Sequence, residues 1–359
     1  MTSRLNLHPA LHSTSPVRRS LLRAGLGLGA GLTFGLPLGL PFGLSAHAAG
    51  AQSLTLYNGQ HAKTTQLLID AFTEATGITV NIRKGNSVQL ANQIIEEGSR
   101  SPADVLYTEE SPPVAALAER NLLARLPEGV VSQVRSGYAA DDGTWVGITA
   151  RCRVTVYNRN MVDAAELPAS VLDMATEAWE GRLAFVPTSG AFQQQIIAIE
   201  TLRGRDVALQ WLKDLKKYGR IYNNNMAAMR AVERGEIATG LINNYYWYIV
   251  AREVGAENMN SALHFSGPGD PGALITVSAA GVLKTAPNAD AAQRLVEFMV
   301  SPEGQGVLAK AVAEWPMNPA IQPGFDLKPF DELSPPRVNP ASLGGAAEAL
   351  ELRREAGLA

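Results

Sequence analysis

The sequence predicts an α/β protein whose two lobes enclose a ligand cleft. Between residues 53 and 108, apolar runs of strand length alternate with stretches of helical periodicity, as in a parallel sheet covered by helices. A second alternation of this kind begins near residue 182, and extended segments join the two. Two α/β units connected in this way predict two lobes around a cleft, with hinge closure over the ligand.

The composition is that of an ordinary globular protein. The chain has 359 residues, of which 46% are hydrophobic and 18% are charged, so two domains with large cores are expected. A net charge of −3 provides no basic footprint for nucleic acid. The single cysteine, Cys152, excludes a disulfide within one chain. It lies in an apolar strand, where a packed, non-catalytic thiol is expected.

Residues 1–48 are predicted to be an export signal that is removed from the mature protein. They contain no acidic residue; Arg18 and Arg19 precede an apolar Gly/Leu/Ala run, and Ala46-His47-Ala48 forms a small-residue cleavage site. The arrangement fits a twin-arginine signal, while a general secretory signal that happens to hold two arginines is the alternative. No cysteine is placed to carry a lipid anchor, so we expect a soluble, monomeric periplasmic protein.

The first lobe is predicted to comprise residues 49–152 and about 273–325. Gly77 is the expected C-terminal cap of its first helix, and Asn86 with Gln89 resembles a capping box for its second. Strands are expected at Ser53–Tyr57, Ile78–Ile82, Asp104–Thr108 and about 273–283, and helices at 62–76, from Asn86 to near Gly98, from Ser111, near 289–300 and at 301–314.

The second lobe is predicted to comprise residues 153–272 and about 326–359. Two extended segments, Trp145–Thr149 and Cys152–Tyr157, lead into it. It is expected to contain strands at Arg182–Val186 and Ala238–Asn243, a turn at Pro187–Ala191, and helices at Phe192–Leu202, about 205–217, about 226–234 and from about 345.

Potential metal ligands follow the predicted strands at their C-terminal ends, where open α/β sheets bind ligands. They are His61, Glu109, and the adjacent pair Tyr245 and Tyr246. One imidazole, one carboxylate and two phenolates suit a hard ion such as ferric iron. Each has a structural alternative: a surface or capping histidine, a glutamate that interacts with a helix dipole, and an aromatic packing stripe from Tyr245 to Tyr248.

A candidate anion site precedes the helix that is expected from Phe192. The turn Thr188-Ser189-Gly190-Ala191 presents free N–H groups and the positive end of the helix dipole, which suits phosphate or carbonate. A plain serine N-cap explains the same residues without a ligand.

Four segments resemble the periplasmic ferric-iron-binding proteins, the bacterial transferrin analogues that supply iron to an ABC importer. They are Tyr57–His61, Pro102–Glu109, Thr188–Phe192 and Leu241–Tyr248, whose NNYYWY run is the most specific. The resemblance implies the two-lobed fold of a type II periplasmic binding protein, an importer permease and its ATPase as partners, and Fe³⁺ as cargo. It also implies that His61, Glu109, Tyr245 and Tyr246 bind the metal, and that Ser189, Gly190, Ala191, Asn225 and Asn243 hold a synergistic anion, usually phosphate.

One residue departs from the family pattern. Glu110 stands where familiar members carry glutamine near the anion. A second carboxylate would repel phosphate unless it is protonated, turned away or paired with an arginine. Because phosphate makes the metal site anionic, we expect uncharged N–H donors around it.

Two other functions are weighed against iron binding. A carrier of a small organic anion, such as a phosphonate or carboxylate, has no need for His61 and Glu109. A metal-dependent hydrolase is disfavoured because the chain after residue 48 contains no HExxH, G-x-S-x-G or P-loop motif. The sequence therefore predicts a binding protein and not an enzyme.

Overall fold

The computed structural model describes residues 53–359, which belong to one compact unit, Ala49–Ala359. The predicted export signal at residues 1–48 lies outside the described residues. Among the residues described, no helix is both long enough and apolar enough to cross a membrane.

A ten-stranded mixed sheet organises the molecule. Its order is β2-β1-β3-β9-β4-β7-β5-β6, and β8 and β10 both pair with β4. The strands are β1 (Ser53–Asn58), β2 (Thr79–Lys84), β3 (Val105–Thr108), β4 (Val146–Asn158), β5 (Leu183–Phe185), β6 (Arg220–Ile221), β7 (Thr239–Asn243), β8 (Ser261–His264), β9 (Ile275–Val282) and β10 (Trp315–Pro316). The α-helices are α1 (Ala62–Thr76), α2 (Ser87–Glu97), α3 (Ser111–Glu119), α4 (Glu128–Val131), α5 (Gly190–Arg203), α6 (Arg205–Tyr218), α7 (Asn225–Glu233), α8 (Tyr245–Val254), α9 (Ala289–Val300), α10 (Pro302–Ala311) and α11 (Ala346–Glu355).

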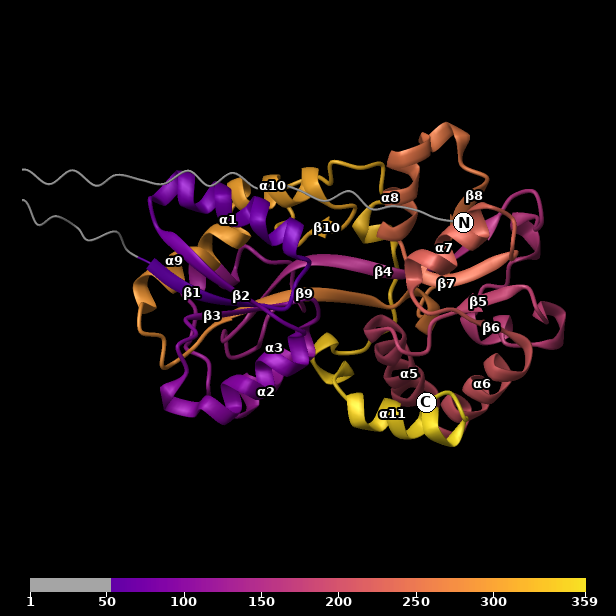
Figure 1. The fold of residues 1–359 in the computed structure, drawn as a ribbon, viewed down its shortest axis with the longest axis horizontal. Coiled ribbons are helices and arrows are strands. Elements are labelled where there is room, and N and C mark those ends of the chain that lie inside the picture. The colour runs from indigo at the N-terminus through magenta and orange to yellow at the C-terminus, as the bar shows by residue number, and fades with distance from the viewer. Residues whose placement is uncertain (1–52) are drawn as a thin grey trace, which may run out of the picture. The chain divides into compact units, whose positions relative to one another are not determined.

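The long strands β4 and β9 connect the two halves of the sheet, and Figure 1 shows them side by side through its middle. The prediction of two separate extended segments in this region was wrong, because residues 146–158 form one continuous strand. A register shift against β9 between Gly147 and Ala150 interrupts the regular pairing there. The first part of β4 pairs with β9, and its last residues pair with β7 and β8.

Alternating side chains place helices on both faces of the first half of the sheet. Leu54 and Leu56 of β1 pack in one core cluster with Phe72 of α1, while Tyr57 belongs to a second cluster with residues of α2 and α3. The caps predicted at Gly77 and Asn86 are confirmed, but among the described residues Gln89 does not make the reciprocal side-chain bond of a capping box. Gly77 ends α1 in the left-handed region with φ of 72°, and the Asn86 side chain accepts hydrogen bonds from two backbone N–H groups of α2.

The second half repeats this arrangement. Leu183 and Phe185 of β5 pack with residues of α5, α6 and α11, whereas Ala184 packs on the other side with α7. One local prediction was wrong, because α5 begins at Gly190 and not at Phe192. The helix α8, which begins at the tyrosines after β7, was not predicted. The lobe boundaries stay a prediction; α11, which was assigned to the second lobe, packs against α5 and α6.

Candidate metal and anion site

A hydrogen-bonded turn between β1 and α1 positions His61. The Asn58 side chain accepts from Gln60 N at 3.1 Å and donates to Gln60 O at 2.9 Å, and Gln60 Oε1 accepts from His61 N at 2.7 Å. Polar side chains that bond to their own turn fix its conformation. The imidazole at the start of α1 remains half exposed, with 48% of its side chain accessible.

Ser87, at the start of α2, connects the turns that carry His61 and Glu109. Its Oγ donates to Gly59 O at 3.3 Å and accepts from Glu109 N at 3.1 Å. His61 Nδ1 lies 4.0 Å from Glu109 Oε2. Ser87 was not predicted from the sequence, because a residue that joins two turns has no motif of its own.

Asn244 holds the beginning of α8, where the tyrosines lie. This buried side chain accepts from Cys152 N at 3.0 Å and donates to Ala313 O at 2.8 Å. The rings of Tyr245 and Tyr246 are 4.3 Å apart between centroids, and that of Tyr245 lies 6.0 Å from the His61 ring in an edge-on arrangement. Tyr245 therefore lies beside both the imidazole and Tyr246.

All nine residues predicted to bind metal or anion line one cavity of about 400 Å³. On its anion side, Asn225 Nδ2 lies 3.2 Å from Ser189 Oγ and 3.4 Å from the hydroxyl of Tyr246. Ser189 is also the N-cap of α5, since its Oγ accepts from Phe192 N. The nine are His61, Glu109, Ser189, Gly190, Ala191, Asn225, Asn243, Tyr245 and Tyr246.

Six helices begin at this cavity. The N-cap residues of α1, α2, α3, α5 and α7 line it, and α8 contributes its first two residues. Helix N-termini carry partial positive charge and free N–H groups, which favour carboxylates, phenolates and bound anions. The arrangement therefore suits a site that gathers negative charge.

Proton competition is expected at the phenols and at Glu110. Burial, then the neighbouring Tyr246 and Glu109, raises the pKa of Tyr245 well above its usual value, so the phenol stays protonated without a cation. Burial, then the adjacent Glu109, raises the pKa of Glu110 to about 7, while Arg151 opposes the shift. A metal that binds Tyr245 must displace its proton, so acid weakens such binding.

A buried arginine, Arg151, adds a charged donor to a cavity where only uncharged donors were expected, and a second, Arg153, lies nearby. Arg151 lines the cavity, and its Nη2 lies 3.8 Å from Glu109 Oε1 and 4.0 Å from Glu110 Oε2. Its Nε and Nη1 are buried without a partner among residues 53–359. Burial lowers the pKa of Arg153 to about 10, opposed by the nearby Tyr245 and Tyr246. Neither arginine was predicted from the sequence as part of the site. Cys152, which lies between them, is fully buried, as expected.

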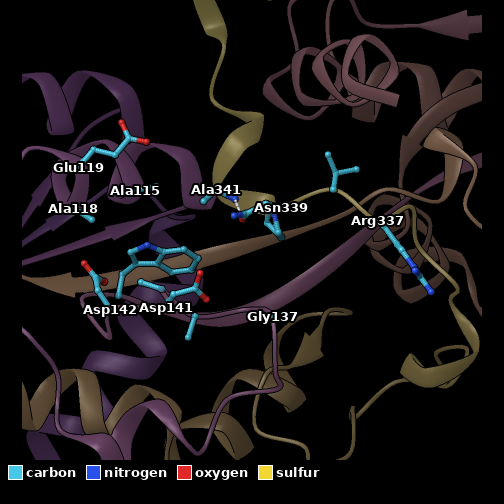
Figure 2. A pocket seen from close by; sticks show the side chains of 14 residues that line it. Ala115, Ala118, Glu119, Gly137, Asp141, Asp142, Arg337, Asn339 and Ala341 are labelled. Atoms are coloured by element: carbon cyan, nitrogen blue, oxygen red, sulfur yellow. Dashed lines mark hydrogen bonds between the residues drawn. The ribbon is translucent and has the colours of Figure 1, made fainter. Parts of the chain in front are cut away.

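A second cavity, of about 490 Å³, contains none of the nine residues. Figure 2 shows Glu119, Asp141, Asp142 and Arg337 around it. Within residues 53–359, no group of three or more His, Cys, Asp and Glu side chains is arranged to hold a metal ion. The predicted set has only two residues of those types, His61 and Glu109, and depends on the two phenols.

Comparisons with known proteins identify the family to which the chain belongs. A family model described as bacterial extracellular solute-binding protein matches residues 68–330. The major ferric iron-binding protein of Neisseria meningitidis is 44% identical over 317 residues, which cover 88% of this chain and 96% of the relative. The Fe(3+)-binding periplasmic protein of Serratia marcescens is 36% identical over 315 residues, covering 87% of this chain and 93% of the relative. Iron-bound HitA from Pseudomonas aeruginosa has a TM-score of 0.81 at 52% identity, covering 86% of this chain and 100% of that structure.

Fold and neighbours together define a two-lobed periplasmic binding protein of type II, as the sequence predicted. Within that class, the chain belongs to the bacterial extracellular solute-binding protein family, in its group of periplasmic ferric-iron-binding proteins.

Proposed function

We propose that this protein binds Fe³⁺ in the periplasm together with an anion and delivers it to an ABC importer. One observation carries the proposal: an imidazole, a carboxylate and two phenols line the same cavity, beside helix N-termini with free donors. The relatives named for ferric iron binding support the same cargo.

His61, Glu109, Tyr245 and Tyr246 are the proposed metal ligands. Two phenolates and one carboxylate neutralise Fe³⁺, and the imidazole adds a neutral donor. Ser189, Gly190, Ala191, Asn225 and Asn243 are proposed to hold the synergistic anion. Phosphate is the first candidate and carbonate the second. Arg151 adds a cation beside them.

The proposed partners are an importer permease and its ATPase, to which the protein docks as a soluble monomer. Residues 1–48 serve in this proposal as the export signal. The twin-arginine route is favoured, and the general secretory route is the alternative.

Calorimetry on metal-free protein tests the choice of ligand. We expect strong heat and unit stoichiometry with ferric nitrilotriacetate in the presence of phosphate. Small phosphonates and carboxylates without iron are expected to give no comparable signal. Tight binding of such an organic anion without metal, with no response to iron, would overturn the proposal in favour of an organic-anion carrier.

A further inference from the structure

Arg153 makes its hydrogen bonds beneath the anion side of the cavity. It lies on β4 directly opposite Asn243 of β7, because these residues are Cα partners in the antiparallel register. Side chains that face each other across two strands contact one another on the same side of the sheet. Arg153 and Asn243 are only 1% and 2% exposed.

Two amide oxygens hold the guanidinium. Arg153 Nη1 donates to Asn243 Oδ1 at 3.2 Å, and Nε donates to Gln195 Oε1 at 3.2 Å. Gln195 Nε2 in turn donates to Pro271 O at 3.1 Å. A planar fork held at two points has little freedom to rotate, so the contact with Asn243 has a fixed direction.

Chemistry alone determines which end of the Asn243 amide faces Arg153. A guanidinium has five N–H donors and no acceptor, so only the oxygen of the amide can point toward it. The NH₂ group must then point away. Asn243 lines the cavity, and its Nδ2 donates to none of the other described residues.

We infer that Arg153 is a positioning residue that turns the NH₂ group of Asn243 toward the synergistic anion. This inference rests on the proposed function, and it concerns the selectivity of that site. With its oxygen engaged by Arg153, Asn243 presents only donors to the cavity. A tetrahedral oxyanion such as phosphate, rich in acceptor oxygens, gains from such a wall. Without Arg153 the amide is free to turn its oxygen toward the anion and repel it.

A double-mutant cycle tests the inference, with the anion effect as the readout. Iron affinity is measured from the visible absorbance of ferric nitrilotriacetate titrations, with and without phosphate, and separately with bicarbonate. The anion enhancement is the iron affinity measured with the anion divided by the iron affinity measured without it. We expect Arg153→Met and Asn243→Leu each to reduce it by about tenfold, the effect of losing one charge-assisted hydrogen bond. Because both act through one amide, the double variant should lose no more than either single variant.

Arg159→Lys, just beyond the end of β4, is the control and should leave the enhancement unchanged. Where Arg153→Met does not fold, Arg153→Gln carries the test: glutamine accepts as well as donates and no longer dictates the amide orientation, so the same loss is expected. Additive losses in the cycle, or a full enhancement in the Arg153 variants, would overturn the inference. Wild-type protein that binds no iron, or whose iron binding responds to neither anion, would instead contradict the proposed function.

Discussion

Glu110 is a second carboxylate beside the proposed anion site, where the sequence alone predicts that it would repel the anion. The sequence offered three ways to avoid this repulsion: protonation, turning the side chain away, and pairing with an arginine. The first and the third are present together. Arg151 lies 4.0 Å from the Glu110 carboxylate, and burial beside Glu109 raises the pKa of Glu110 to about 7. Near neutral pH the side chain is therefore partly protonated and repels an anion less than a full carboxylate.

The raised pKa predicts a stability that falls with increasing pH in the metal-free protein. Between its ordinary value of 4.5 and about 7, the folded state binds the Glu110 proton more tightly than the unfolded state does. Stability is therefore lost as pH rises through this window. From pH 5 to pH 8 we expect a loss of about 2 kcal/mol relative to Glu110→Gln; the full shift is reduced because the side chain is 21% exposed. Urea unfolding of both proteins measures this difference, and parallel pH profiles would contradict it.

The arginines mark the limit of prediction from individual residues. Histidine, glutamate and tyrosine after strand ends suggest a site by their chemistry, and the structure places them around one cavity. Arg151 and Arg153 lie inside an apolar strand and not after a strand end, so their place in the sequence did not suggest a role in the site. Their spacing of two residues was the available signal, since it places both on the same face of β4. Which groups face them depends on the pairing of Arg151 with β9 and of Arg153 with β7, and such long-range register does not follow from the local pattern.

Among the secondary-structure elements, α8 is the instructive miss. Its sequence Tyr-Tyr-Trp-Tyr-Ile-Val is rich in aromatic and β-branched residues, which favour strands over helices. Tertiary contacts decide the outcome, because Asn244 binds β4 and residue 313 at the helix start. Because Tyr245 and Tyr246 begin this helix, both phenols lie at the cavity. In a continued strand, the two adjacent side chains would point to opposite faces of the sheet.

The turn between β1 and α1 requires glycine at position 59. A Cβ added to Gly59 would lie 2.5 Å from Ser87 Oγ, 2.7 Å from Ser87 Cα and 2.9 Å from Ser87 N. The backbone at the start of α2 has no room to yield. We expect Gly59→Ala to lower the free energy of unfolding by about 2 kcal/mol. Iron affinity should also fall at least about tenfold, because the turns that carry His61 and Glu109 are pushed apart.

Gly306→Ala in α10 is the matched control for that change. No atom lies within 4 Å of a Cβ added to Gly306, and this residue does not line the cavity. Iron titration should therefore give values close to wild type, and the free energy of unfolding should not fall. A Gly59→Ala protein as stable and as tightly binding as Gly306→Ala would show that the two turns move independently.

For the molecule as a whole, the alternation of strands and helices was sufficient to predict the fold class. Periods of 2 and 3.6 residues are local properties, so Leu54 and Leu56 of β1 and Phe72 of α1 indicate their core face without any contact being known. The continuity of β4 and its pairing with four other strands, β7, β8, β9 and β10, were not predicted, since the pairings join residues far apart in sequence. The strands β6, β8 and β10 were not predicted; β6 and β10 have only two residues each, which is too few to show a periodicity.

The central claim is that segments from distant parts of the chain converge on one Fe³⁺ ion through Tyr245 and Tyr246. The measurement that tests it most directly is the visible spectrum of the purified protein titrated with Fe³⁺ and phosphate. We predict a strong charge-transfer band from tyrosinate to iron. It should be lost in the double variant Tyr245→Phe/Tyr246→Phe. It should be kept in Tyr248→Phe, because Tyr248 of the same helix does not line the cavity and its hydroxyl donates to Asp326 O. A colourless wild-type protein, or unchanged iron binding in the double variant, would contradict the account.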